Sequence, residues 1–362
     1  MERVLQVVTD MNLGGIEALI MNYYRKMSRN DVQFDFLMHR AKPSFFDEEI
    51  LSLGGRIYRL PPIYPQTFLK YRQELNRFFK EHSYRVVHAH NNAYSMFVLR
   101  EAQRHGVPVR IASSHCAFPK LGLIQQVTYN YCRSKINRYC TKRFACSIPA
   151  GQWLYSGETF DILSNAIDAE HFFFSQQRRE SCRSQMGIED NFVIAHVGRF
   201  TYPKNHSFLL DTFAKVLERE SRSKLMLIGD GELRRELEKK ATQLLPKEAV
   251  IFLGIRDDVP ALLQAADVFV FPSHFEGLPV TLIEAQAAGL PCIKSENVTD
   301  EAVVTDLVTS LPLGDPKMWA EAILKTRGTP RRDQTRAIID SGYDIHTAVK
   351  KLEYFYLNGE PL

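Results

Sequence analysis

Short apolar runs rich in β-branched residues alternate with longer amphipathic stretches along nearly the whole chain. Such alternation is typical of βαβ units around a parallel sheet and predicts an α/β fold. In the first half we expect strands at 4–8, 33–38, 56–60, 86–89, 109–113, 143–146 and 161–163, and helices that include 16–27 and 68–81. This half therefore predicts one doubly wound parallel sheet.

The same alternation starts again after a polar stretch at residues 175–190. Here we expect strands at 192–196, 224–228, 250–252 and 268–271, and helices at 207–220, 232–244, 259–265 and 279–288. A chain of 362 residues also exceeds one ordinary domain of ~100–200 residues. The sequence thus predicts two Rossmann-like domains, a linker near 168–176, and a ligand cleft facing the carboxyl ends of both sheets.

Composition places the chain among globular proteins, with 45% hydrophobic and 24% charged residues. No apolar run approaches the ~20 residues that a membrane-spanning helix needs, and polar residues interrupt the first segment too early for a signal peptide. The six cysteines show no CxxC spacing, which argues against a zinc site or a disulfide framework. We therefore expect a cytoplasmic protein.

Charge is unevenly distributed between the two halves. Residues 1–166 carry 22 Lys and Arg against 13 Asp and Glu, a net +9, whereas residues 167–362 carry 24 against 29, a net −5. The stretch 118–143 holds six basic residues and no acidic one, with Tyr129 and Tyr139 expected on its surface. This stretch would suit an anionic membrane surface or a nucleic acid, and a simple solvated face explains it equally well.

Gly14 and Gly15 lie between the first expected strand and the helix that follows it. Glycines at such a turn let the backbone approach a ligand, and the helix N-terminus favours a phosphate. The full GxGxxG pattern is absent, which argues against a nicotinamide or flavin. A tight turn without a ligand is the alternative.

A second loop, after the first strand of the second half, carries Arg199 and Lys204 with Pro203 between them. A guanidinium and an ammonium that converge from one stiffened loop suit the oxygens of a diphosphate and could replace a metal ion. Two basic residues on a loop are, on their own, more often simply solvated.

The third loop follows the expected strand 268–271 and runs into a helix beginning at Pro279. Glu276 lies in this loop and Glu284 lies in the helix, with seven residues between them. Carboxylates accept hydrogen bonds from vicinal hydroxyls, so the pair could hold a ribose and a second sugar while backbone N–H groups hold phosphates. Singly, each residue is also explained as a helix-dipole or solvated acid.

Together these motifs resemble the retaining glycosyltransferases of family 4, which have the GT-B architecture of two Rossmann-like domains facing across a cleft. Glu276 and Glu284 match that family's E-x7-E pair, and Gly198 to Phe200 with Lys204 match its diphosphate clamp. The further matches are Gly14 and Gly15, Gly229 to Leu233, Phe252 to Gly254, and Ser164 to Asp168. The segment 282–295 resembles the branch that assembles bacterial exopolysaccharide and capsule.

The resemblance assigns roles to these residues. Glu284 would bind the ribose, Glu276 the transferred sugar, and Arg199 with Lys204 the pyrophosphate. His115 would line the donor sugar, although a capping or core imidazole is the alternative. The other donor-binding residues implied are Gly14, Gly15, Gly198, Gly229, Gly254, Phe275, Gly277 and Leu278. No metal ligand and no cofactor are expected.

The implied activity is retaining transfer of a hexose or N-acetylhexosamine from a nucleotide sugar, most simply a UDP-sugar, to a lipid-linked saccharide at the inner face of the membrane. Residues 1–168 with a C-terminal helix at 343–362 would bind the acceptor, and residues 169–342 the donor. The stretch 118–143 would contact the anionic membrane. A homo-oligomer stays open as an alternative.

Three other functions stay open from the sequence. The first is a non-catalytic subunit that binds a sugar nucleotide for a partner enzyme. The second is a nucleic-acid-binding protein, which the lack of a nucleic-acid motif argues against. The third is a GT-B sugar-nucleotide epimerase, which would need no acceptor.

Overall fold

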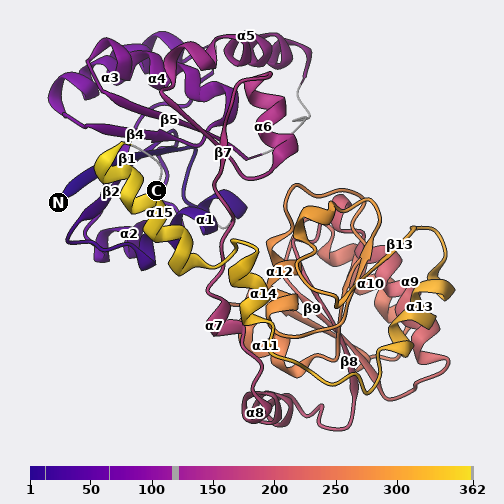
Figure 1. Cartoon of the computed structure of the whole chain (residues 1–362). Coiled ribbons are helices and arrows are strands. Elements are labelled where there is room, and N and C mark those ends of the chain that lie inside the picture. Colours follow the sequence, from indigo (N-terminus) through magenta and orange to yellow (C-terminus); the bar gives the residue numbers. More distant parts are fainter. Residues whose placement is uncertain (13, 65, 116–121, 360–362) are drawn as a thin grey trace. The chain divides into compact units, whose positions relative to one another are not determined.

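The computed structural model describes residues 1–12, 14–64, 66–115 and 122–359 (Figure 1). The chain divides into two compact units. The first unit contains Met1–Ala166 and Ile345–Leu362, and the second contains Ile167–Asp344. The divisions lie two residues from the boundaries expected at 168 and 343, and the final helix belongs to the first unit.

The first unit is built on a parallel sheet in the order β3-β2-β1-β4-β5-β6-β7. Its strands are β1 (Glu2–Val8), β2 (Val32–Met38), β3 (Arg56–Arg59), β4 (Val86–Ala89), β5 (Val109–Ser114), β6 (Lys142–Ala145) and β7 (Asp161–Ile162). The order reverses between β1 and β4, and ligands of doubly wound sheets bind beyond the carboxyl ends at such a switch point. All seven expected strands are confirmed, with ends that differ by at most two residues.

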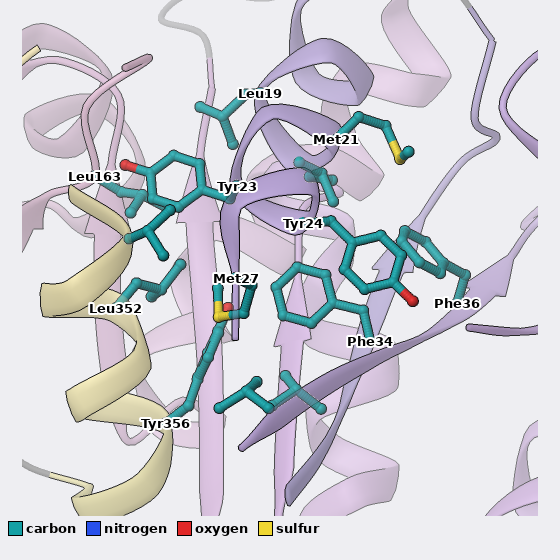
Figure 2. Packing of buried hydrophobic residues seen from close by; sticks show 14 of the residues in the cluster. Leu19, Met21, Tyr23, Tyr24, Met27, Phe34, Phe36, Leu163, Leu352 and Tyr356 are labelled. Atoms are coloured by element: carbon teal, nitrogen blue, oxygen red, sulfur yellow. The ribbon is translucent and has the colours of Figure 1, made fainter. Parts of the chain in front are cut away.

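Helices cover both faces of this sheet. They are α1 (Gly15–Lys26), α2 (Asp47–Ser52), α3 (Phe68–Glu81), α4 (Ser95–Arg104), α5 (Leu123–Tyr139), α6 (Ile148–Tyr155) and α15 (Ile345–Asn358). One hydrophobic core lies under α1 and α15, where Leu352 and Tyr356 pack among Tyr23, Phe34 and Leu163 (Figure 2). The other core lies under α3, α4 and α5.

The second unit has a six-stranded parallel sheet in the order β10-β9-β8-β11-β12-β13. Its strands are β8 (Phe192–Val197), β9 (Ser223–Ile228), β10 (Val250–Gly254), β11 (Val268–Phe271), β12 (Cys292–Ser295) and β13 (Val308–Leu311). Its helices are α7 (Ala169–Phe172), α8 (Gln176–Met186), α9 (His206–Leu217), α10 (Arg234–Leu244), α11 (Val259–Ala265), α12 (Val280–Ala287), α13 (Pro316–Lys325) and α14 (Thr335–Asp340). The sequence predicted four of these strands and missed β12 and β13.

The polar stretch 175–190 contains helix α8, which the sequence did not predict. Its N-terminus is capped by the Ser175 hydroxyl, which accepts from the backbone N–H of Arg178, and it ends at Gly187 in a left-handed conformation. Arg183 is buried and donates to the carbonyl of Ala265 at 2.7 Å. The two caps and the buried Arg183 therefore stabilise α8, although its sequence has no continuous apolar face.

Tyr129 on α5 is buried at 3% exposure, so the expectation of an exposed ring was wrong. It packs edge-on against Tyr94 with ring centroids 5.5 Å apart. Tyr139 is half-buried. The helix turns these rings toward the sheet and exposes other residues. Positions 118–121 of the basic stretch lie outside the described residues.

Within the described residues, no helix combines the length and apolarity that a membrane span requires.

Candidate active site

Two loops of the second unit are fastened together beside the carboxyl ends of β8 and β11. The backbone N–H of His274 donates to the carbonyl of Pro203 at 2.8 Å, and Asn205 Nδ2 donates to the carbonyl of Pro272 at 3.2 Å. The rings of Tyr202 and His274 also stack, with centroids 4.7 Å apart. These contacts fix the positions of the residues between them.

Lys204 and Glu276, one from each loop, form an ion pair. The distance from Lys204 Nζ to Glu276 Oε1 is 2.8 Å, and the two side chains are only 18% and 14% exposed. Lys204 Nζ also lies 4.7 Å from the centroid of the Phe271 ring, which is within cation–π range. The structure thus brings together two residues that the sequence predicted for the same site, while Arg199 lies exposed on the first loop.

Glu284 lies in α12, which begins one residue after the expected start at Pro279. Its side chain is half-buried, and loss of hydration raises the pKa of its carboxyl to about 7. A carboxylate held in this way gains from any hydroxyl that donates to it, because the donor replaces the lost water. The position suits recognition of a diol.

Glycines let the loop after β8 approach its neighbours closely. At Gly229 the φ angle is +137°, and a Cβ atom there would lie 2.1 Å from the carbonyl oxygen of Gly198. At Gly198 itself, a Cβ would lie 3.2 Å from Lys204 Cδ. The N–H of Gly229 donates to the carbonyl of Gly254 at 2.8 Å. Gly277 has open space where a Cβ would be, and Leu278 is half-buried beside it.

Several buried polar atoms near these loops have no hydrogen-bond partner among the described residues. They are Ser273 Oγ, His196 Nε2 and both ring nitrogens of His206. Ser273 and His206 are 0% and 1% exposed. Burial lowers the pKa of His206 to about 2, so the ring is neutral. Sequence reasoning missed these residues, although Ser273 lies two residues after the end of β11 and His206 begins α9.

In the first unit, Gly14 and Gly15 lie where β1 leads into α1. Gly14 is the N-cap in an extended conformation with φ −162°, so neither glycine is required by a left-handed turn. Gly15 is exposed, and a Cβ there would meet nothing within 4 Å. The backbone at Gly15 is therefore exposed, and ligand binding at this turn stays a prediction.

His115 lies directly after β5 and is half-buried. Its backbone N–H donates to Asn92 Oδ1 at 2.8 Å, and its ring Nε2 lies 2.9 Å from His90 Nδ1. Loss of hydration lowers the pKa of His115 to about 4, so the ring is neutral at physiological pH. The residue is anchored at its backbone and at one ring nitrogen.

A cavity of about 340 Å³ lies at the carboxyl ends of β1, β2 and β4. Its lining combines aromatic, amide and basic side chains: Thr9, Ile16, His39, Arg40, Ile63, Tyr64, His90, Asn91, Asn92, Tyr94 and Tyr129. Aromatic faces next to hydrogen-bonding groups suit a saccharide or another polar ligand. Sequence reasoning did not single out Arg40 or Tyr64, because residues of separate loops meet here.

Two units, each built on a doubly wound parallel sheet, are the architecture of the GT-B glycosyltransferases. The family described as Glycosyl transferases group 1 matches residues 191–327, and the Glycosyl transferase 4-like domain matches residues 14–154. EpsF of Bacillus subtilis is 39% identical over an alignment of 372 positions, which covers 98% of this chain and 96% of EpsF. The chain belongs to glycosyltransferase family 4, as the sequence motifs indicated.

Two further comparisons extend this result. The Escherichia coli UDP-Gal:alpha-D-GlcNAc-diphosphoundecaprenol alpha-1,3-galactosyltransferase is 26% identical over 78% of each chain. Among solved structures, HepE from Anabaena in complex with UDP-glucose superposes with a TM-score of 0.76 at 19% identity, covering 99% of this chain and 100% of HepE. The structural likeness confirms the GT-B fold.

Proposed function

We propose that this glycosyltransferase transfers a hexose or N-acetylhexosamine, with retention of configuration, from a UDP-sugar to a lipid-linked saccharide during bacterial polysaccharide assembly. The names of its relatives support this choice of substrates. The Escherichia coli relative uses UDP-Gal and a diphosphoundecaprenol acceptor, and CapH of Staphylococcus aureus, 25% identical over 99% of both chains, acts in capsular polysaccharide biosynthesis. HepE binds UDP-glucose.

The observation that carries the proposal is the ion pair of Lys204 and Glu276, in the same unit as the half-buried Glu284 of α12. A diphosphate offers Lys204 a stronger anionic partner, and a sugar hydroxyl offers Glu276 a donor. Glu284 accepts hydrogen bonds from the ribose hydroxyls. The diphosphate, the transferred sugar and the ribose of a UDP-sugar therefore each have a proposed partner in the second unit.

Departure of UDP places negative charge on the β-phosphate in the transition state. Arg199, Lys204 and the backbone N–H groups at the start of α12 supply fixed positive charge for it, so no divalent ion is required. We assign no side chain as the general base, because an oxygen of the departing phosphate can accept the proton of the acceptor hydroxyl. The cavity in the first unit that contains Arg40 and Tyr64 is proposed to hold the acceptor saccharide.

Helix α5 is proposed to hold the enzyme at the anionic inner face of the membrane. Val127 and Tyr131 are 72% and 55% exposed, and Lys135 and Arg138 continue the same exposed stripe. Apolar side chains among basic ones suit an interfacial helix. The helix carries no acidic residue to oppose this attraction.

The function is tested by incubating the purified chain with a panel of UDP-sugars and an undecaprenyl-diphosphate-linked sugar, with and without EDTA. We expect an elongated lipid-linked product of unchanged anomeric configuration, equally fast with EDTA. Lys204→Ala and Glu284→Ala should abolish its formation. Product formation at wild-type rates in either variant would refute the assignment, and binding of UDP-sugar without turnover would favour a non-catalytic subunit.

A further inference from the structure

A continuous chain of hydrogen bonds runs through the first unit and ends at His115. His115 Nε2 lies 2.9 Å from His90 Nδ1, and His90 Nε2 lies 2.9 Å from Gln6 Oε1. Gln6 Nε2 lies 3.2 Å from Tyr356 Oη on α15, and Tyr356 Oη lies 2.7 Å from His88 Nδ1. His88 Nε2 completes the chain at 2.7 Å from Ser113 Oγ.

The chain is embedded in the apolar core under α1 and α15. Gln6, His88, His90 and Tyr356 are each at most 3% exposed. In the parallel register Gln6 lies opposite His88, and His90 shares a face with His88 because it follows two residues later. Both ring nitrogens of each of these two histidines are within hydrogen-bond distance of protein partners.

The hydrogen-bond donors in this chain have a fixed order. Burial lowers the pKa of His90 well below its usual value, so the ring is neutral and has one N–H. With Gln6 Oε1 as the acceptor, that N–H is at Nε2, and His90 Nδ1 must accept. The donor to His90 Nδ1 is therefore His115 Nε2–H. His115 is left with an unprotonated Nδ1, which has no partner among the described residues.

The same order continues toward the other end. Gln6 Nε2–H donates to Tyr356 Oη, whose own proton is then available to His88 Nδ1. The four internal members, His90, Gln6, Tyr356 and His88, each give one hydrogen bond and accept one, so a change in one of these bonds alters the next. Tyr356 holds the amide orientation of Gln6, and that orientation selects the tautomer of His90 and of His115.

We propose that Tyr356, Gln6 and His90 are positioning residues that hold His115 in its Nε2-protonated form, with Nδ1 available to accept a hydroxyl of the substrate. This inference rests on the proposed function for its effect on transfer, whereas the tautomer itself is independent of activity. The final helix thereby contributes to the active site through a hydroxyl that never touches substrate. A neutral acceptor nitrogen suits a sugar hydroxyl, which needs an acceptor for its proton.

The test compares Tyr356→Phe with Tyr24→Phe. Tyr24 is a matched control because it lies in the same core, is fully buried, and bonds its hydroxyl to Gln33 Oε1 at 2.6 Å, away from His115. We expect Tyr356→Phe to lower kcat about tenfold with KM for the donor within about twofold, since one oriented hydrogen bond is lost. Tyr24→Phe should keep kcat within about twofold of wild type.

The tautomer is measured directly by long-range ¹H–¹⁵N spectra of histidine-labelled protein, with His115 assigned from a His115→Ala sample. Wild type and Tyr24→Phe should show His115 protonated at Nε2, and Tyr356→Phe should show a mixture or the Nδ1 form. An unchanged His115 signal in Tyr356→Phe, an Nδ1-protonated His115 in wild type, or equal loss of kcat in both variants would overturn the proposal. If wild type transferred no sugar, the proposed function would be refuted instead. The spectra would still test the tautomer of His115, because they do not depend on activity.

Discussion

Lys204 Nζ lies 2.8 Å from Glu276 Oε1, and the pair joins two loops whose backbones are already bonded to each other. Each charge compensates the other in a position with little access to water. Two residues that are predicted to bind the nucleotide sugar therefore also form an ion pair with each other. Their contributions to stability and to binding can be separated by experiment.

Removal of one member of this pair should destabilise the protein. Lys204→Met leaves the Glu276 carboxylate without its cation, and we expect the free energy of unfolding to fall by about 1–3 kcal/mol. The double variant Lys204→Met/Glu276→Gln should recover most of that loss while remaining inactive. Urea denaturation of wild type, Lys204→Met, Glu276→Gln and the double variant gives the cycle, and additive losses would show that the pair contributes no coupling.

Glu284 should make stability depend on pH in the unusual direction for a carboxyl. Its folded pKa of about 7 lies above the ordinary value, so the folded state binds more protons than the unfolded state between about pH 4.5 and 7. Its contribution is therefore most favourable at low pH and is lost as the pH rises. Between pH 4.5 and pH 8, the free energy of unfolding of Glu284→Gln should rise by about 2–3 kcal/mol relative to that of wild type. Denaturation at a series of pH values measures this difference. If the free energies of unfolding of wild type and Glu284→Gln changed in parallel with pH, the raised pKa of Glu284 would be contradicted.

The same carboxyl should control binding of the nucleoside. Uridine is the suitable probe because it has ribose hydroxyls but no phosphate that titrates near neutral pH. Its affinity should rise by up to about tenfold between pH 6 and pH 8, as Glu284 loses its proton and becomes the stronger acceptor. In calorimetric titrations, Glu284→Gln should bind uridine weakly and without this rise.

Two glycines of the second unit should differ sharply in how well they tolerate substitution by alanine. Gly229→Ala places a Cβ 2.1 Å from a backbone oxygen and forces a side chain to adopt φ +137°, so it should destabilise the fold by about 3 kcal/mol or more. Gly277→Ala meets no neighbour and should leave the melting temperature within about 2 °C. Thermal denaturation of both variants distinguishes the two sites, and equal tolerance would contradict the close approach.

Membrane binding should depend on the charges of α5. Lys135→Glu/Arg138→Glu reverses two exposed charges and should lower the fraction bound to vesicles containing phosphatidylglycerol more than tenfold, at about 1 kcal/mol per charge. Arg235→Glu/Lys239→Glu makes the same net change on exposed positions of α10 and should have little effect. Flotation assays measure both. Equal losses would indicate attraction by net charge alone.

Local patterns predicted the regular elements well where apolar periodicity is strong. The observed α3 (Phe68–Glu81), β4 (Val86–Ala89) and α11 (Val259–Ala265) have the expected bounds, because each has a continuous apolar face or a buried run. Helix α8 was missed because it is held by a cap and by Arg183, which bonds to distant carbonyls. Such contacts leave no periodic signal in the sequence.

Among the candidate site residues too, those in local motifs could be predicted, whereas those joined by distant contacts could not. The proximity of Lys204 and Glu276 was predictable, since each follows a strand end in a motif, and their role in binding stays a prediction. The chain from His115 to Tyr356 was not, because its members come from four segments and Gln6 and Tyr356 lie 350 residues apart. His88 and His90 were noticed as a pair, but only tertiary packing shows which atoms they bond.

The distance in sequence between Gln6 and Tyr356 also sets the order of events during synthesis. Every residue of the second unit leaves the ribosome before Tyr356 does, so that unit can fold while the first still lacks α15 and the apolar surface it covers. At about 5–20 residues per second, this interval lasts on the order of ten to forty seconds. The unit that is made first is therefore the last to be completed, and its exposed face needs protection from aggregation in the meantime.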